Sequence, residues 1–468
     1  MQGADRALSA IARALGDDAV LRDPDVRASY ATDESEVPAS TPAAVVRARS
    51  TEDVAAVMAA ASEHRVPVTP RAGGTGRVGG AVPVEGGLVL SVERMDAVEH
   101  IERRDGIAVV QPGVVTGALH AAVEAEGLFY PPDPNSLGSC ALGGNIAANA
   151  GGPRAFKYGV TRQYVLGLTV VLPDGTVVSL GRRTAKGVTG YDLTALMVGS
   201  EGTLGVVTEA IVRLIPKPES VHTLMVFLAD DQDIAGAVDE ALSRRIVPSC
   251  VELLDAGALD IVSRQAGLAV PRGASAMLLM ELDGDDAVVP GQLETVGNAL
   301  DDRGAVEVLV AQNASERERL WAARRELSHS FRKEAAFKLS EDVVVPRTKL
   351  AALLGRCRAI AEEHAITMPS YGHAGDGNLH VNFLWDDPGA RPRVDDAIKA
   401  LFEAVVQMGG TLSGEHGIGV LKAPYLPLEQ SAALIALQER VKGVFDPEGI
   451  MNPGKIFPAA ARRFHGAC

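Results

Sequence analysis

Hydrophobic positions recur at two spacings along the chain, and each spacing predicts one type of element. Val54, Val57, Met58 and Ala61 follow the spacing of one helix face, and Ser50 precedes them as a capping residue. Short apolar runs bounded by glycine, proline and aspartate predict strands at 66–69, 88–92, 165–172, 177–180 and 206–214. The first part of the chain is therefore predicted to be a mixed α and β domain.

Proline breaks the chain at Pro216 and Pro218, and a different order of elements follows. Strands are predicted at 223–228, 250–254, 276–282 and 306–310, alternating with helices at 234–244, 256–265 and 288–302. We interpret this order as an antiparallel sheet with helices on one face, so that the fold class is α+β. The predicted divisions are an N-terminal helical segment at 1–37, a domain at 38–217, a second domain at 218–458 with a C-terminal helical segment, and a tail at 459–468.

Composition and charge exclude several classes of protein. With 60 acidic and 45 basic residues, the formal net charge is −15, which disfavours binding to nucleic acid or to an anionic membrane surface. The cysteines at 140, 250, 357 and 468 lack the spacing of an iron–sulfur cluster or a thiolate zinc site, and they fit reduced thiols in the cytosol. The N-terminus lacks the pattern of a signal peptide, and no apolar run approaches the roughly 18 residues of a membrane span. We therefore expect a cytoplasmic protein.

Glycines are clustered in loops that follow predicted strands. The segment 70–80 contains five glycines and two arginines between two strands. Since glycine reaches positive φ without strain, such a loop can turn successive backbone N–H groups toward one anion. A plain surface turn would need fewer glycines, so we expect this segment to bind a pyrophosphate. It is neither a Walker A loop nor a Rossmann fingerprint, because no Lys-Ser/Thr pair and no helix follows the glycines.

Two further glycine-rich loops, at 131–152 and 199–205, favour a flat ligand. Small residues in the first of them would let a ring system lie against the backbone, and its asparagine side chains can satisfy ring heteroatoms. The second leads into the predicted strand at 206–214. Three such loops carried by strands predict one cofactor domain.

Two short segments near the end of the chain concentrate its chemistry. One is Tyr-Gly-His-Ala-Gly-Asp-Gly-Asn-Leu-His-Val-Asn at 371–382, and the other is Ser-Gly-Glu-His-Gly-Ile-Gly at 413–419. His380 and Asn382 point to the same side of a predicted strand, and His373 precedes a glycine-rich turn that can fold it back toward them. A single histidine is more often a hydrogen-bonded core residue. Two imidazoles with the glutamate of the second segment, however, are compatible with zinc, manganese or iron.

These loops and motifs recur in the same order in a known flavoprotein family. From about residue 20 to 458 the chain resembles the FAD-linked oxidases of the vanillyl-alcohol-oxidase-like flavin fold. Within them it is similar to the D-2-hydroxy acid dehydrogenases, which include D-lactate dehydrogenase, the flavin subunit of glycolate oxidase and D-2-hydroxyglutarate dehydrogenase. The resemblance implies a two-part FAD-binding domain (PCMH-type) at 38–217 and an antiparallel-sheet substrate domain after it.

The resemblance also implies which residues contact FAD, and that FAD is non-covalent. The 70–80 loop has no histidine or cysteine, and Cys140 stands where members with dissociable FAD also carry cysteine. The implied FAD-binding residues are Arg71, Ala72, Gly73, Gly74, Thr75, Gly76, Arg77, Gly79, Gly80, Pro131, Asp133, Gly138, Gly143, Gly144, Asn145, Asn149, Gly151, Gly152, Tyr158, Gly159, Glu201, Gly202, Gly205, Val207 and Asn452.

By the same resemblance, His373, His380 and Glu415 would hold a divalent metal, zinc or manganese. A 2-hydroxy acid can chelate such an ion through a carboxylate oxygen and its hydroxyl, which lowers the pKa of the hydroxyl. His416 is the candidate catalytic base, because histidine is the side chain best suited to exchange protons at neutral pH. Its alternative role is to orient the metal ligands.

The substrate would be bound by Arg324, Ser328, Lys338 and Asn382. Arg324 matches the arginine of the family's Trp-x-x-Arg segment, and Ser328 lies one helical turn further on. Lys338 is the second candidate cation, although its spacing to Pro346 is longer than in the hydroxyglutarate enzymes. If Arg324 and Lys338 face one distal carboxylate, a diacid such as D-2-hydroxyglutarate is favoured. If Lys338 lies at the surface, D-lactate or glycolate fits equally well.

The sequence thus predicts an FAD-dependent D-2-hydroxy acid dehydrogenase that forms the 2-oxo acid by metal-assisted proton abstraction and hydride transfer to FAD. Its partners would be a hydroxy acid and an electron acceptor, namely a quinone, a cytochrome, an electron-transfer flavoprotein or an iron–sulfur subunit. Alternatives are another flavin reaction on the same fold, such as alkyl-dihydroxyacetonephosphate synthesis or a reductase, and a flavin-binding subunit of a larger oxidase complex. We expect a homodimer, cytoplasmic or peripheral to the inner face of the membrane through its acceptor.

Overall fold

A computed structural model describes residues 2–458, so the predicted tail and Cys468 lie outside the described residues. The chain divides into two compact units. Unit 1 comprises the described residues up to Gly152, Gly159–Lys217 and the described residues from Glu415 onward, whereas unit 2 comprises Pro153–Tyr158 and Pro218–Gly414. The last described part of the chain thus returns to unit 1, whereas the sequence analysis grouped it with the second domain.

Unit 1 begins with a four-stranded sheet covered by two helices. Its strand order is β1-β2-β4-β3, with β2 and β3 parallel to β4 and β1 antiparallel to β2. α1 and α3 pack on it through a core that includes Ile11, Met58 and Leu90. Ser50 caps α3 by accepting a hydrogen bond from the N–H of Asp53 at 3.2 Å, so the predicted capped helix is confirmed. The bounds are α1 (Gln2–Leu15), β1 (Val20–Leu21), α2 (Pro24–Ser29), β2 (Ala44–Arg47), α3 (Thr51–Glu63), β3 (Val68–Arg71) and β4 (Leu88–Ser91).

A second sheet of unit 1 has five strands in the order β5-β6-β10-β8-β9, and all neighbours are antiparallel. The strands predicted at 165–172, 177–180 and 206–214 are confirmed as β8, β9 and β10. The edge strand β5 was not predicted, because its exposed positions do not alternate regularly with apolar ones. The bounds are β5 (Val98–Glu102), β6 (Ile107–Val110), α4 (Thr116–Ala125), β7 (Leu128–Phe129), α5 (Leu142–Ala148), β8 (Val165–Val171), β9 (Val177–Gly181), α7 (Leu193–Met197), β10 (Val206–Arg213) and β11 (Ile215–Pro216).

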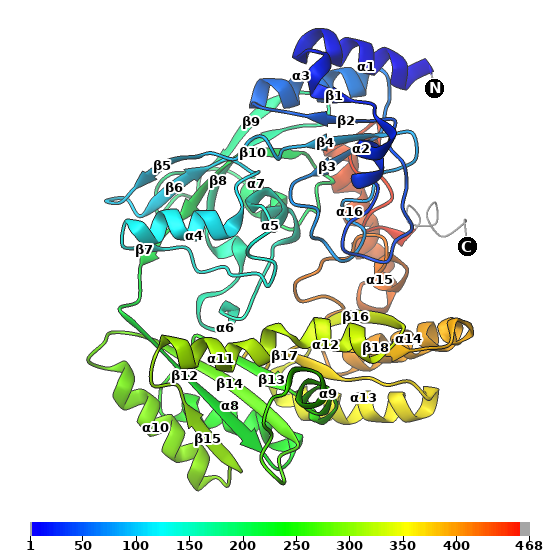
Figure 1. Ribbon diagram of the computed structural model, residues 1–468. Helices are drawn as coiled ribbons and strands as arrows, with labels where there is room; N and C mark the ends of the chain where they lie inside the picture. The colour runs from blue at the N-terminus through cyan, green and yellow to red at the C-terminus, as the bar shows by residue number, and fades with distance from the viewer. Residues whose placement is uncertain (1, 459–468) are drawn as a thin grey trace. The chain divides into compact units, whose positions relative to one another are not determined.

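Unit 2 is built on one seven-stranded sheet in which every pair is antiparallel, as predicted. The strand order is β15-β12-β14-β13-β17-β18-β16, and Figure 1 shows these strands in green to yellow. β13 has the predicted bounds, and β12 and β14 extend the predicted runs. The bounds are β12 (Ser220–Leu228), β13 (Cys250–Leu254), β14 (Ala276–Gly284), β15 (Glu307–Val310), β16 (Phe337–Val344), β17 (Ser370–His373) and β18 (Asn378–Trp385).

Helices of unit 2 cover both faces of this sheet, which adds a second layer to the one that the sequence predicted. Phe227 and Leu279 share a core with α9 and α12, whereas the intervening Val226 and Leu278 are equally buried and point to the opposite face. α8 contacts both α10 and α13, and α10 contacts β12 and β14. The bounds are α6 (Ala155–Tyr158), α8 (Ile234–Ser243), α9 (Ala256–Ala266), α10 (Val289–Asp302), α11 (Ala314–Arg325), α12 (Leu327–Glu334), α13 (Leu350–His364) and α14 (Arg391–Gln407). Over residues 2–458, no helix has both the length and the apolar character that crossing a bilayer requires.

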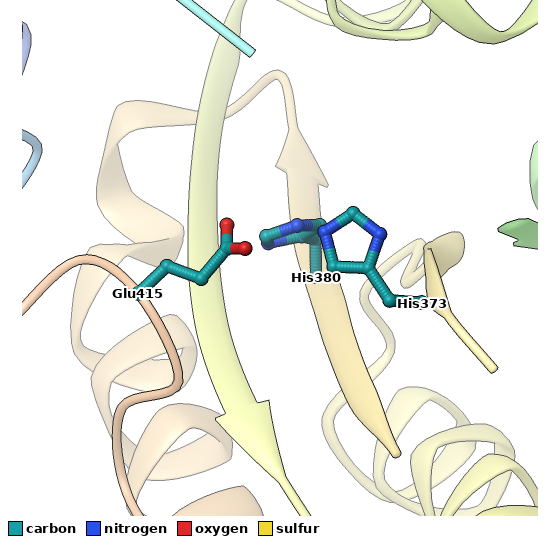
Figure 2. Close-up of side chains that lie close together, drawn as sticks. All are labelled: His373, His380 and Glu415. Carbon is teal, nitrogen blue, oxygen red and sulfur yellow. The ribbon is translucent and has the colours of Figure 1, made fainter. Parts of the chain in front are cut away.

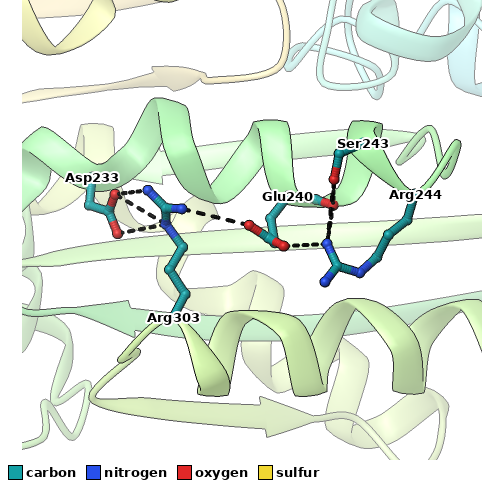
Figure 3. Close-up of polar contacts among 5 residues, drawn as sticks. All are labelled: Asp233, Glu240, Ser243, Arg244 and Arg303. Carbon is teal, nitrogen blue, oxygen red and sulfur yellow. Dashed lines mark hydrogen bonds and ion pairs between the residues drawn. The ribbon is translucent and has the colours of Figure 1, made fainter.

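Ion pairs join α8 and α10 at the surface of unit 2. The guanidinium of Arg303, just after α10, binds both carboxylate oxygens of Asp233 and lies 3.6 Å from Glu240, which in turn binds Arg244 (Figure 3). These side chains are partly exposed, so each pair contributes no more than about 1 kcal/mol to stability. The apolar core, and not this network, therefore holds the two helices.

A buried carboxylate anchors the last described segment within unit 1. Asp446 follows α16 (Ala432–Phe445), accepts hydrogen bonds from the N–H groups of Ile450 at 3.0 Å and Met451 at 2.9 Å, and pairs with the ammonium of Lys442. Met451 forms a parallel bridge with Val68 of β3. One carboxylate thus links the end of a helix to the edge of the first sheet.

Asp446→Ala is expected to lower the free energy of unfolding by about 2–4 kcal/mol, because the mostly buried Lys442 would lose its counter-ion and two backbone N–H groups would lose their acceptor. Urea unfolding followed by circular dichroism measures this. Glu448→Ala is the matched control in the same unit, since it removes an exposed pair with Arg65 at 2.8 Å and should cost less than about 1 kcal/mol. Equal effects of the two substitutions would contradict the anchoring role of Asp446.

Candidate functional site

Two buried histidines of unit 2 come from neighbouring strands of one hairpin. His373 ends β17 and His380 lies in β18, where Tyr371 is its partner in the register. The two imidazole rings have centroids 5.4 Å apart and are nearly perpendicular. The prediction that His380 lies in a strand is confirmed, and the glycine-rich turn after His373 folds it back beside His380 as expected.

A buried aspartate joins this hairpin to the second motif. Asp342 of β16 lies opposite His380 in the sheet, and its Oδ1 accepts a hydrogen bond from Asn378 at 2.6 Å and lies 3.9 Å from His380 Nδ1. Its Oδ2 accepts hydrogen bonds from Ser413 Oγ at 3.1 Å and from the N–H of Gly414 at 2.9 Å. One carboxylate therefore fixes both the hairpin and the residue that precedes the predicted third ligand.

The three predicted metal ligands meet at one point. Glu415 directly follows Gly414, so the backbone brings its carboxylate to the hairpin. One donor atom from each of His373, His380 and Glu415 lies within 4.8 Å of the other two, and Figure 2 shows the carboxylate facing the two rings. Donors held at about 2.1 Å from one ion lie up to about 4.2 Å apart. A small adjustment of side chains would therefore let these residues hold a divalent metal.

Glu252 of β13, which the sequence analysis did not identify, orients His373. Its side chain is fully buried, with Oε1 bound to His373 Nδ1 and Oε2 bound to Arg324 Nε. Burial acts to raise the pKa of Glu252, but the charges of His373 and Arg324 outweigh it and lower the pKa. When His373 is neutral, the hydrogen bond to the carboxylate favours the tautomer with its proton on Nδ1, which leaves the lone pair on Nε2, as metal binding requires.

The predicted substrate-binding cations lie on two neighbouring elements. Lys338 of β16 donates a hydrogen bond to Ser328 Oγ of α12 at 2.9 Å, so an ammonium and a hydroxyl are adjacent. Arg324, near the end of α11, is bound to Glu252, and its guanidinium carbon lies 4.5 Å from the centre of the Tyr371 ring. The structure thus brings Ser328 and Lys338 together, and the Nε of Arg324 is bound to the buried carboxylate of Glu252.

Asn382, predicted to contact the substrate, has a structural role for its amide nitrogen. The nitrogen donates hydrogen bonds to the backbone oxygens of Pro369 at 3.3 Å and His380 at 3.1 Å. Asn382 is completely buried in β18. Its carboxamide nitrogen therefore stabilises the strand that carries His380.

The loop that carries His416 is held within unit 1 by Glu201. The two oxygens of the Glu201 carboxylate accept hydrogen bonds from the N–H groups of Ile418 and Gly419, both at 2.7 Å. A Cβ at Gly417, whose φ is +84°, would lie 2.9 Å from this carboxylate. Burial raises the pKa of Glu201, and the two N–H groups partly offset this. Glu201, predicted to contact FAD, thus fixes the backbone next to the candidate base.

The glycine-rich loop after β3 has the features of an anion site. Within residues 2–458, no protein group accepts a hydrogen bond from the N–H of Gly73, Gly74, Thr75 or Gly76. Arg71 anchors the start of the loop through a 2.6 Å hydrogen bond to the oxygen of Thr32. Four successive donors available to a ligand fit the predicted pyrophosphate site.

Gly73 also sets the distance between the first two loops. A Cβ there would lie 2.7 Å from the backbone oxygen of Ser139 and 3.1 Å from the nitrogen of Ala141. Gly151 has a corresponding role at the other motif, because a Cβ there would lie 2.7 Å from Glu415 Oε1. Glycine is thus required at both positions, because the neighbouring segment lies too close for a side chain.

Several other predicted FAD contacts are engaged with the protein itself. Asn145 donates a hydrogen bond to Thr116 Oγ1 at 2.6 Å, and Asn149, in a left-handed conformation, accepts one from the N–H of Arg162 at 2.9 Å. Asn452 donates to the backbone oxygens of Gly80 at 3.0 Å and Glu201 at 2.8 Å. The hydroxyl of Tyr158 donates to Asp283 at 2.8 Å within unit 2. The three asparagine side chains thus hold loops of unit 1 that are predicted to line the cofactor.

Sequence reasoning missed two residues that organise this region, Glu252 and Asp342. Each is a carboxylate with no exposed surface, Glu252 in the otherwise apolar strand β13 and Asp342 in β16, where polar and apolar residues are mixed. A charged residue in a buried strand needs a partner, which is a signal that the sequence does contain. The identity of the partner, however, depends on strand order.

Comparison with known families gives matches over most of the chain. A model of the FAD binding domain matches residues 42–181, and a model of the C-terminal domain of FAD linked oxidases matches residues 217–456. The second range includes both histidine motifs.

Curated relatives match nearly the whole chain. Glycolate oxidase subunit GlcD of Bacillus subtilis is 41% identical over 93% of this chain and 93% of its own length. D-lactate dehydrogenase of Anaerostipes hadrus is 36% identical over 89% of each chain, and D-2-hydroxyglutarate dehydrogenase of Stutzerimonas stutzeri is 35% identical over 94% of this chain and 96% of its own. Among solved structures, p-cresol methylhydroxylase superposes with a TM-score of 0.79 at 18% identity, covering 97% of both chains. This last likeness confirms the predicted fold.

Gly73→Ala is expected to weaken FAD binding about tenfold or more, because the added methyl group forces apart two backbone segments that meet at the predicted pyrophosphate loop. Flavin content and a fluorescence titration of the apoprotein measure this. Gly443→Ala on α16 is the control, since its Cβ would meet nothing within 4 Å. Unchanged FAD affinity in Gly73→Ala would place the cofactor elsewhere.

Proposed function

Because the chain belongs to the family of FAD-linked oxidases and contains its FAD-binding domain, we propose that this FAD-dependent oxidoreductase oxidises a D-2-hydroxy acid to the 2-oxo acid. Relatives named glycolate oxidase subunit, D-lactate dehydrogenase and D-2-hydroxyglutarate dehydrogenase support this class of substrate. The proposal includes non-covalent FAD and a divalent ion, zinc or manganese.

The observation that carries the proposal is the cluster of His373, His380 and Glu415, whose donor atoms lie within 4.8 Å of one another. The cluster has the chemistry of a metal site with open positions, because it offers two imidazoles and one carboxylate. The carboxylates of Glu252 and Asp342 face the Nδ1 atoms of the two histidines, which favours metal binding through Nε2. A bound divalent ion would act as a Lewis acid on the carboxylate and hydroxyl oxygens of the substrate.

His416 is the residue that we propose to remove the hydroxyl proton. It is adjacent to Glu415, and the hydrogen bonds that the Glu201 carboxylate accepts from the N–H groups of Ile418 and Gly419 hold the backbone that carries it. A neutral imidazole can act as a general base and accept the proton of a hydroxyl. FAD supplies the hydride acceptor, and the electrons then pass to a separate acceptor of the quinone, cytochrome or flavoprotein class.

The acid side chain would be bound by Arg324, Ser328 and Lys338. The 2.9 Å contact between Lys338 and Ser328 supports a site that presents a cation and a hydroxyl to one carboxylate. Such a site favours a diacid, of which D-2-hydroxyglutarate is an example. D-lactate and glycolate are the alternatives if this pair does not reach the substrate.

Anaerobic visible spectra of the FAD-loaded protein test the proposal. We expect D-2-hydroxyglutarate, D-lactate or glycolate to bleach the flavin, a chelator to abolish this, and zinc or manganese to restore it. A protein that binds FAD but is bleached by none of the three acids would contradict the proposed substrate class. Bleaching that survives complete metal removal would contradict the metal-assisted route.

His416→Ala is expected to slow flavin reduction by about 10²–10⁴-fold, because the hydroxyl proton would lack a positioned acceptor. Stopped-flow absorbance measures this, with the FAD and metal contents expected to remain unchanged. His100→Ala is the control, since this exposed histidine of β5 lies far along the chain from both motifs. Near-normal reduction in His416→Ala would assign the base to another group.

A further inference from the structure

A fully buried glutamate occupies the centre of the strand that borders the histidine hairpin. All five residues of β13 are buried. Glu252 is charged, and its four neighbours in the strand are Cys250, Val251, Leu253 and Leu254. Burying an unpaired carboxylate costs several kcal/mol, so such a residue requires close partners. Here it has two, the imidazole of His373 and the guanidinium of Arg324.

Strand register fixes the first of these contacts. β13 pairs with β17 so that Glu252 lies directly opposite His373. The two side chains are therefore neighbours on the same face of the sheet. The imidazole cannot rotate away from the carboxylate without losing the hydrogen bond to Nδ1 in a dry environment.

The second contact comes from a different layer. Arg324 reaches Glu252 from α11, and its guanidinium lies over the ring of Tyr371, 4.5 Å from the ring centre. Tyr371 in turn lies 5.1 Å from the His380 ring. The guanidinium is thus held by a carboxylate on one side and an aromatic face on the other.

We propose that Glu252 is a positioning residue shared by two parts of the site, holding His373 for the metal and Arg324 for the substrate carboxylate, so that the metal site depends on Arg324. This inference rests on the proposed function. With a metal ion bound at its Nε2, His373 would be a stronger donor to Glu252 through Nδ1–H, which would leave more of the positive charge of Arg324 for an anionic substrate. Conversely, loss of Arg324 lets Glu252 move and loosens the imidazole.

The test is zinc affinity, measured by calorimetry on the metal-free, FAD-loaded protein, so that no turnover is involved. Glu252→Gln, which keeps the size of the side chain, should weaken zinc binding by about 10–100-fold. Arg324→Gln should also weaken it, about tenfold, although Arg324 is not one of the predicted ligands. The double substitution should bind zinc no more weakly than Glu252→Gln alone, because both act through one contact.

Glu281→Gln is the matched control. Glu281 is a nearly buried carboxylate of the neighbouring strand β14 that also accepts two hydrogen bonds, from Thr223 Oγ1 and Trp321 Nε1, both at 2.7 Å. This substitution should leave zinc affinity unchanged, whereas a general loss of folding would affect both glutamate variants. Circular dichroism of each variant checks the fold independently.

The outcomes separate the two proposals. If the unsubstituted protein fails to bind zinc or manganese, the proposed metal-assisted function is wrong. If it binds zinc and Glu252→Gln binds equally well, the positioning role of Glu252 is wrong. If Glu252→Gln loses affinity but Arg324→Gln does not, or if the two losses add, the dependence of the metal site on Arg324 is overturned.

Discussion

The tight hairpin of β17 and β18 is the constraint on which the candidate metal site depends. Gly372 lies opposite Leu379, and a Cβ at Gly372 would lie only 2.2 Å from the backbone oxygen of Asn378. Gly377 has φ of +83°, and a Cβ there would lie 2.0 Å from the oxygen of Val345. Glycine is therefore required at both positions. This close pairing brings the rings of His373 and His380, seven positions apart in the chain, to a centroid distance of 5.4 Å.

Buried carboxylates hold the histidines and the neighbouring backbone in position. Glu252 and Asp342 face the two histidines from neighbouring strands, and Asp342 also binds the chain at Gly414. In unit 1, Glu201 binds the backbone just after His416. Each carboxylate gains partners that offset its desolvation, so the network is stable only when every member is present. The geometry of the candidate site thus depends on residues outside the three predicted metal ligands.

The sequence predicted the local elements well because the periodicity of apolar residues is a local property. β13 has the predicted bounds, the helix capped by Ser50 forms, and His380 lies in a strand. The motif residues were found because unusual residue types are concentrated in short segments. The FAD-binding fold and the family followed from the same motifs, and the comparisons confirm both.

The sequence did not reveal which distant residues meet. Glu252 and His373 are 121 positions apart, and they meet only because β13 and β17 are neighbours in the sheet. Tyr158 donates a hydrogen bond to Asp283, 125 positions away. The chain from Glu415 onward belongs to unit 1 by its contacts, and no local pattern in the sequence encodes those contacts. Strand order and the second layer of helices are properties of the whole fold.

X-ray absorption spectroscopy of the zinc-loaded protein would test the central claim most directly, because it reports the metal ligands independently of turnover. The account predicts two imidazole nitrogens and additional oxygen donors at about 2.0–2.2 Å, with one imidazole lost in His380→Ala. A spectrum with oxygen ligands alone, or one that is unchanged in His380→Ala, would contradict it.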